Sequence, residues 1–208
     1  MTQPTNALPM IFADTTIALH VAFLLRSLPA IEPSSLRRAL IAALESLDHM
    51  TRRQSDWLDR LLGTPSETVD FGGLSRIEIA GQCSMITDAV LQRLPSPEVF
   101  AMLARFALTE PEKTAGVFGV VAHVAHASPV GNRNALIDLT WRRYLPRRFK
   151  GGYALREIEK RTGVSRSTLD RAGHWLDDEL DGLELQALRR LERTFVPHGV
   201  CHAVEMMQ

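Results

Sequence analysis

The chain has 208 residues, of which 45% are hydrophobic and 23% are charged; these values are typical of a globular protein and argue against a disordered chain. Its 24 basic and 24 acidic side chains give no net charge, which argues against a histone-like protein coated in positive charge. Every stretch of 18 residues that is rich in apolar side chains also contains a charged residue or a proline. We therefore expect no membrane span.

Cysteine usage and the start of the chain indicate the compartment. The two cysteines, Cys83 and Cys201, are far apart in the sequence, as in a reduced cytoplasmic protein rather than a disulfide-rich secreted one. The first residues, Met1 to Pro4, lack the basic segment of a signal peptide. We therefore expect a cytoplasmic protein.

The first third of the chain predicts helices joined by loops. Asp14 is the expected N-cap of a largely buried helix. Pro33 stands at the expected start of a second helix, whose apolar side chains repeat every three or four residues through 36–47 and continue at 57–62. Residues 63–73 contain Gly, Pro, Ser, Thr and Asp, and predict a loop.

Further helices are predicted up to residue 144. Ser75 and Glu78 match a capping box at the start of a helix that runs to about residue 94. Three shorter helices are then expected, at 99–106, 111–124 and 135–144. No segment alternates as a strand would, so the predicted fold class is all-α.

Residues 155–176 have the pattern of a helix-turn-helix. A predicted helix over 155–162 is followed by a turn and by a second helix from Arg166. Gly163 suits a tight turn that requires a positive φ, and Ser165 suits the N-cap of the second helix. The side chains expected to be buried where the two helices cross are Ile158, Val164, Leu169 and Ala172.

The segment Thr162-Gly163-Val164-Ser165-Arg166-Ser167-Thr168-Leu169 resembles the helix-turn-helix family. Similar segments occur in the DNA-binding modules of transposases and resolvases, in the promoter-reading C-terminal region of sigma factors and in sigma-like phage regulators. The resemblance covers residues 155–176 and implies double-stranded DNA as the partner. Glu159 and Thr162 depart from the pattern, because the family usually has Ala or Gly at the first position and a larger apolar residue at the second. A carboxylate at the helix crossing would be costly unless it turns to solvent.

Basic residues gather around this motif. Residues 142–171 contain ten Arg or Lys side chains and three carboxylates, a local charge of +7, and an acidic run follows at 177–184. This asymmetry in a neutral chain indicates a phosphate-binding face. The alternative is a solvated basic face that only pairs with the acidic run.

The expected roles within the motif follow from its docking geometry, in which the N-terminal residues of the second helix lie nearest the bases. The candidates for base edges are Arg166, Ser167, Asp170 and Arg171. Asp170 alternatively pairs with Arg166 and orients it. The candidates for phosphate oxygens are Ser165 and Thr168 within the motif, and Arg147, Arg148 and Lys150 in a predicted loop before it.

Weaker patterns would support other chemistry. A zinc site would have to combine two distant segments, one with His123 and His126 and the other with His198, Cys201 and His202. Neither segment contains a Cys-x-x-Cys pair, so we expect no metal or other cofactor. No phosphate loop, dinucleotide fingerprint or nucleophile elbow is present. The scattered aspartates that could supply a recombinase with a carboxylate cluster are Asp14, Asp56, Asp59, Asp70 and Asp88.

Together these patterns predict a sequence-specific DNA-binding transcription regulator, phage-like and not an enzyme. Residues 1–140 are expected to form a helical oligomerisation or partner-binding domain, and residues 141–208 the helix-turn-helix region, with one more helix after the motif over 183–195. A homodimer, RNA polymerase or another protein partner would add affinity to a single motif. The alternatives are a helical interaction or assembly protein, such as a phage packaging component, and a recombinase-type DNA enzyme.

Overall fold

The structure is a computed structural model that describes residues 10–27, 69, 74 and 76–202. Of these residues 77% are helical and none forms a strand, which confirms the all-α prediction. Residue Phe12 makes isolated bridges with Val69 and Cys201. The helices expected at 33–47 and 57–62, and Ser75 of the expected capping box, lie outside the described residues.

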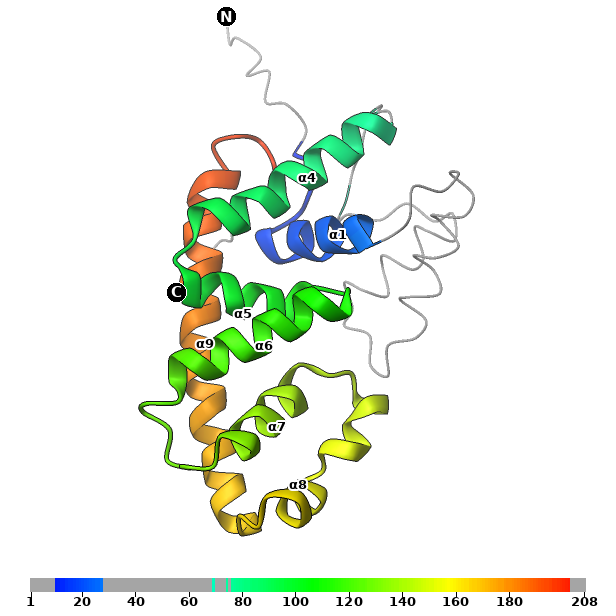
Figure 1. The fold of residues 1–208 in the computed structure, drawn as a ribbon. Coiled ribbons are helices and arrows are strands. Elements are labelled where there is room, and N and C mark those ends of the chain that lie inside the picture. Colours follow the sequence, from blue (N-terminus) through cyan, green and yellow to red (C-terminus); the bar gives the residue numbers. More distant parts are fainter. Residues whose placement is uncertain (1–9, 28–68, 70–73, 75, 203–208) are drawn as a thin grey trace, which may run out of the picture. The chain divides into compact units, whose positions relative to one another are not determined.

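Seven α-helices and one 3-10 helix make up the described chain (Figure 1). They are α1 (Thr15–Ser27), α4 (Arg76–Arg93), α5 (Ser96–Phe106), α6 (Glu110–Val124), α7 (Arg133–Tyr144), η1 (Arg147–Tyr153), α8 (Leu155–Thr162) and α9 (Arg166–Phe195). Within the described ranges, no helix has both the length and the apolar character needed to cross a bilayer.

The chain divides into two compact units, residues 1–89 with 188–208, and residues 90–187. The expected arrangement, with an N-terminal domain at 1–140 and a separate motif region at 141–208, is not confirmed. Helices α5 and α6 and most of α7, which fall within the predicted N-terminal domain, belong to the same unit as the motif.

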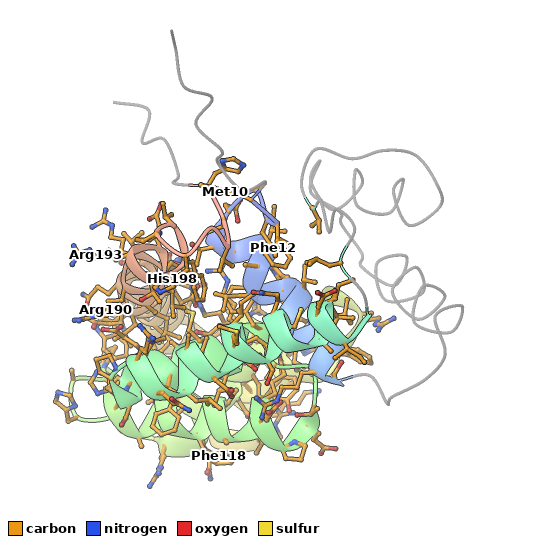
Figure 2. All side chains as sticks on the ribbon, turned by 90° about the horizontal axis from the view of Figure 1, so that it is seen from above. Met10, Phe12, Phe118, Arg190, Arg193 and His198 are labelled. Carbon is orange, nitrogen blue, oxygen red and sulfur yellow. The ribbon has the colours of Figure 1, made fainter. Side chains whose placement is uncertain are left out.

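The first unit joins residues from the two ends of the chain. Asp14 caps α1 as predicted, because its Oδ1 accepts a hydrogen bond of 2.8 Å from the Ile17 N–H. Phe12 is buried, and its backbone N–H donates to the Val200 carbonyl at 3.0 Å. Figure 2 shows Phe12 and His198 in this unit. Cys83 is also buried here, and burial raises the pKa of its thiol to about 12, so it is an inert core residue.

The second unit has one apolar core. Helices α5 and α6 approach closely, because Gly116 faces the backbone of Ala104 and leaves no space for a side chain there. Helix α7 begins after Asn132, whose side-chain oxygen accepts from the N–H groups of Asn134 and Ala135 at 3.0 and 3.2 Å. The core combines side chains of α5 to α9, including Val120, Val121, Leu136, Leu139, Ile158, Leu169, Leu176 and Leu180.

Helix α9 differs from the prediction because it is continuous over 30 residues. The sequence predicted a recognition helix that ends near residue 176 and a second helix over 183–195. No proline interrupts the acidic segment between them, and Gly182 is tolerated inside a helix at a cost of about 1 kcal/mol. Leu185, an apolar residue within the predicted 183–195 helix, is exposed.

Candidate nucleic-acid interface

The turn of the motif has the predicted left-handed geometry. Helix α8 ends at Thr162, and Gly163 follows with φ 71° and ψ 5°. The Gly163 N–H donates to the Glu159 carbonyl at 2.8 Å, which closes the last turn of α8. Val164 and Ser165 complete the connection to α9, which begins at Arg166.

The crossing of α8 and α9 is packed as expected. Ile158, Leu169 and Ala172 are all buried, and Val164 is partly buried against the same cluster. Leu136 and Leu139 of α7 belong to this cluster, so α7 is the third helix of the motif. Figure 1 shows α7 and α8 beside the first half of α9. The three helices therefore fix the direction of the N-terminal end of α9.

Two side chains cap the N-terminal end of α9. Ser165 has the predicted role, since its Oγ accepts from the Thr168 N–H at 3.4 Å. Glu159, whose carboxylate would be costly if it were buried at the helix crossing, accepts an exposed hydrogen bond from the Arg166 N–H through Oε1 at 3.2 Å. A carboxylate at the positive end of a helix dipole is stabilising, which explains why an acidic residue is accepted at this position.

The predicted base-reading residues lie together on the exposed start of α9. Arg166, Ser167, Asp170 and Arg171 are all exposed, and Thr168 is half-buried. The Arg171 Nε–H donates to the Ser167 carbonyl at 3.4 Å. Asp170 lies 3.9 Å from His174 Nε2 rather than pairing with Arg166. Among the described residues no carboxylate pairs with the Arg166 guanidinium, which leaves this cation available to a ligand.

The basic residues before the motif lie on a 3-10 helix, where a loop was expected. Pro146 is the N-cap of this helix, with φ −55° and ψ 150°, and its ring fixes φ near this value. Arg148 is exposed, and its guanidinium lies 4.7 Å from the centre of the Phe149 ring. Lys150 is half-buried. Arg147 is the first residue of η1, and its side chain lies outside the described residues.

Several arginines and lysines counted in the basic cluster are engaged within the protein. Arg161 donates to Asp138 at 2.9 Å and to the Gly152 carbonyl at 2.6 Å. Lys160 pairs with Glu157 at 3.0 Å. The local charge of +7 therefore overstates the positive charge that faces solvent.

Arg143 corrects the charge argument most clearly. Its guanidinium donates to Asp177 and Asp181, each at 2.7 Å, and to Glu184 at 3.1 Å, and its side chain is only 17% exposed. Three carboxylates of the acidic run therefore neutralise this cation. The alternative interpretation of the basic cluster expected such pairing, but on a solvated face, whereas this guanidinium is largely shielded from solvent.

Glu184 is the centre of this ion cluster. Its side chain is 4% exposed, and it accepts from Arg105 of α5, from Arg143 and from the Tyr144 hydroxyl of α7 at 2.8 Å. Burial, and then the Glu184 carboxylate, raise the pKa of Tyr144 above its usual value, so the hydroxyl stays protonated and donates. The cluster thus ties α9 to α5 and α7. It borders a groove of about 710 Å³ that Lys150, Asp170 and His174 also line.

The histidines and the cysteine considered for a zinc site make other contacts. His126 Nδ1 is 2.8 Å from the His123 carbonyl, His198 Nδ1 is 2.6 Å from the Thr194 carbonyl, and Cys201 Sγ is 3.5 Å from the Thr15 hydroxyl. No three potential metal ligands group together within the described ranges.

The candidate carboxylates for a recombinase have other surroundings or fall outside the described residues. Asp14 is the α1 cap and Asp88 is exposed on α4. Asp56, Asp59 and Asp70 are not described.

Sequence reasoning treated Glu159 only as a departure from the motif, and it missed Glu184 and Phe149. Glu159 and Glu184 act across the fold on residues of other elements, and no local spacing marks such contacts. Phe149 carried a signal that was available, an aromatic residue between Arg148 and Lys150.

No protein-family model matches this chain, and no curated protein matches it significantly in sequence. The assignment of function therefore depends on the residues of this region.

Proposed function

We propose that the protein is a sequence-specific, double-stranded-DNA-binding transcription regulator, and that it reads DNA with the first two turns of α9. The observation that carries the proposal is the exposed start of this helix. Arg166, Ser167, Asp170 and Arg171 project from a helix end that Ser165 and Glu159 cap and that α7 and α8 support. Exposed arginines on a fixed helix end suit bidentate contacts with guanine in the major groove.

Charge along α9 indicates which part of the helix meets DNA. The helix rises about 1.5 Å per residue, so its acidic segment begins about 16 Å after Arg166. Asp178 and Glu179 are exposed there, and phosphates would repel them. A duplex is therefore expected to meet α9 at its N-terminal end, and the rest of the helix is expected to point away.

Exposed cations outside α9 supply the expected phosphate contacts. Arg148 on η1 and Arg156 on α8 are exposed. Because several Arg and Lys side chains of the basic cluster bind other residues of the protein, we expect one motif alone to bind DNA with modest affinity. A homodimer, or a protein partner such as RNA polymerase, would add the affinity and the specificity that a regulator needs.

The test is a selection from a pool of duplexes with a randomised core, using the full chain, followed by titrations of the enriched site at several salt concentrations. The proposal expects one enriched sequence, whose affinity falls as salt rises because phosphate contacts release counterions. A chain that enriches no sequence, or binds all duplexes alike, contradicts it.

The same assay separates the alternatives. A helical interaction or assembly protein would leave the pool unbound. A recombinase-type enzyme would cut or join the enriched duplex when a divalent metal is added, and the proposed regulator would leave it intact.

A further inference from the structure

Phe149 is an exposed aromatic side chain within the basic segment that precedes the motif. Its side chain is 54% exposed, although the Arg148 guanidinium lies 4.7 Å from its ring centre. Lys150 follows it directly. An aromatic ring between two cations is poorly matched to water and well matched to a stacked, negatively charged polymer.

The segment that carries Phe149 is held in place by the motif itself. The Phe149 N–H donates to the Pro146 carbonyl at 2.9 Å, within the turn of η1. At the other end of η1, Arg142 of α7 donates to the Tyr153 carbonyl at 3.2 Å, and Arg161 of α8 donates to the Gly152 carbonyl at 2.6 Å. Two arginines from two helices therefore fix η1, so Phe149 is presented by a supported turn.

One residue of η1 and several residues of α9 line the same groove. Lys150 of η1 lines one groove together with Asp170, Gly173 and His174 of α9. A duplex that meets Arg166 and Asp170 is therefore close to the groove that η1 borders.

We infer that Phe149 is a second DNA contact, an apolar wedge that stacks on a base step beside the sequence read by α9, while Arg148 meets the adjacent phosphate. This inference rests on the proposed function and adds to it a deformation of the duplex. Apolar side chains that enter a base step unstack it and kink the DNA. Steps that unstack easily, such as TA and CA, are therefore favoured at this position even though no hydrogen bond reads them.

The test uses three variants of the full chain and the enriched duplex, with 2-aminopurine placed in turn at each flanking position. Phe149→Ala removes the ring, and Phe149→Leu keeps an apolar side chain. Phe118→Ala is the matched control, because Phe118 is another exposed phenylalanine of the same unit, 44% exposed on α6 (Figure 2). Thermal melting of each variant reports its folding.

Wild-type protein is expected to raise 2-aminopurine fluorescence at one flanking step, since unstacking removes quenching by the neighbouring bases. Phe149→Ala is expected to abolish this rise and to weaken binding roughly tenfold, the size of one lost base–aromatic stack. Phe149→Leu should retain part of both effects, and Phe118→Ala should match wild type.

The outcomes separate this inference from the proposed function. If wild-type protein binds no duplex selectively, the proposed function fails and the inference fails with it. If wild-type binding is selective but Phe149→Ala binds equally well, or keeps the fluorescence rise, only the inference is overturned. If Phe149→Ala weakens binding while wild-type protein produces no fluorescence rise at any flanking position, the wedge is also overturned.

Discussion

Replacing Gly163 is expected to destabilise the motif through the backbone alone. A side chain added at Gly163 would meet no atom within 4 Å, so steric overlap contributes nothing. The cost arises from φ 71°, which an L-residue with a Cβ adopts at a penalty of roughly 1–2 kcal/mol. Gly163→Ala should therefore lower the free energy of unfolding by about 1–2 kcal/mol, and Gly163→Val by up to about 3 kcal/mol because β-branching adds strain.

Two further variants isolate this effect. Gly163→Asn should cost less than Gly163→Ala, since asparagine adopts the left-handed conformation more readily. Gly152→Ala is the control, because Gly152 is also exposed, also meets no atom within 4 Å, and has no positive φ. It should match wild type or exceed its stability by about 0.4–1 kcal/mol, through reduced freedom of the unfolded chain.

Urea unfolding followed by circular dichroism measures these differences, and hydrogen exchange of the α8 and α9 amides shows whether the loss lies in the motif. If Gly163→Ala and Gly152→Ala unfold alike, Gly163 does not occupy a left-handed turn and the geometry of the motif is wrong.

Two further predictions concern stability. Arg143→Met should lower the free energy of unfolding by about 2–4 kcal/mol, because it leaves the buried Glu184 carboxylate beside two unpaired aspartates; urea unfolding that matches wild type would refute the ion cluster. Burial lowers the pKa of Lys113 to about 8 from 10.5, so between these values the unfolded chain binds its proton more tightly and the native state gains stability as pH rises. Lys113→Met removes this gain. Between pH 7.5 and pH 10 the free energy of unfolding of wild type should therefore rise relative to that of the variant. If the two free energies change with pH in parallel, the lowered pKa of Lys113 is contradicted.

Much of the described fold was predictable because its signals are local. Asp14 caps the helix that follows it, and Gly163 and Ser165 take the conformation and the bond that their residue types favour. The buried positions Ile158 and Leu169 followed from the spacing of apolar residues on two short helices.

The remaining features depend on contacts between residues far apart in the sequence. Arg143 was counted in the basic cluster around the motif, but its partners lie 34 to 41 residues later on α9. Glu159 was judged costly at the helix crossing because the sequence does not show its partner. That partner is the Arg166 N–H, which reaches Glu159 only when α9 is in place. The sequence analysis missed that α9 is continuous, because it took the run of acidic residues as the end of the recognition helix. That run contains no helix-breaking proline, and the helix passes through it.

The start of α9 is expected to read bases while η1 meets phosphate. A comparison of Arg166→Ala with Arg148→Ala separates these two roles. Both arginines are exposed, so neither substitution should change stability by more than about 0.5 kcal/mol. Each variant is titrated on the enriched duplex and on a scrambled duplex at several salt concentrations. Arg166→Ala should lose about 1–3 kcal/mol on the enriched duplex and much less on the scrambled one. Arg148→Ala should weaken both complexes alike and reduce the salt slope by about one. Equal losses on both duplexes for Arg166→Ala would show that this arginine holds phosphate and does not read sequence, and no loss for either variant would contradict DNA recognition by this end of α9.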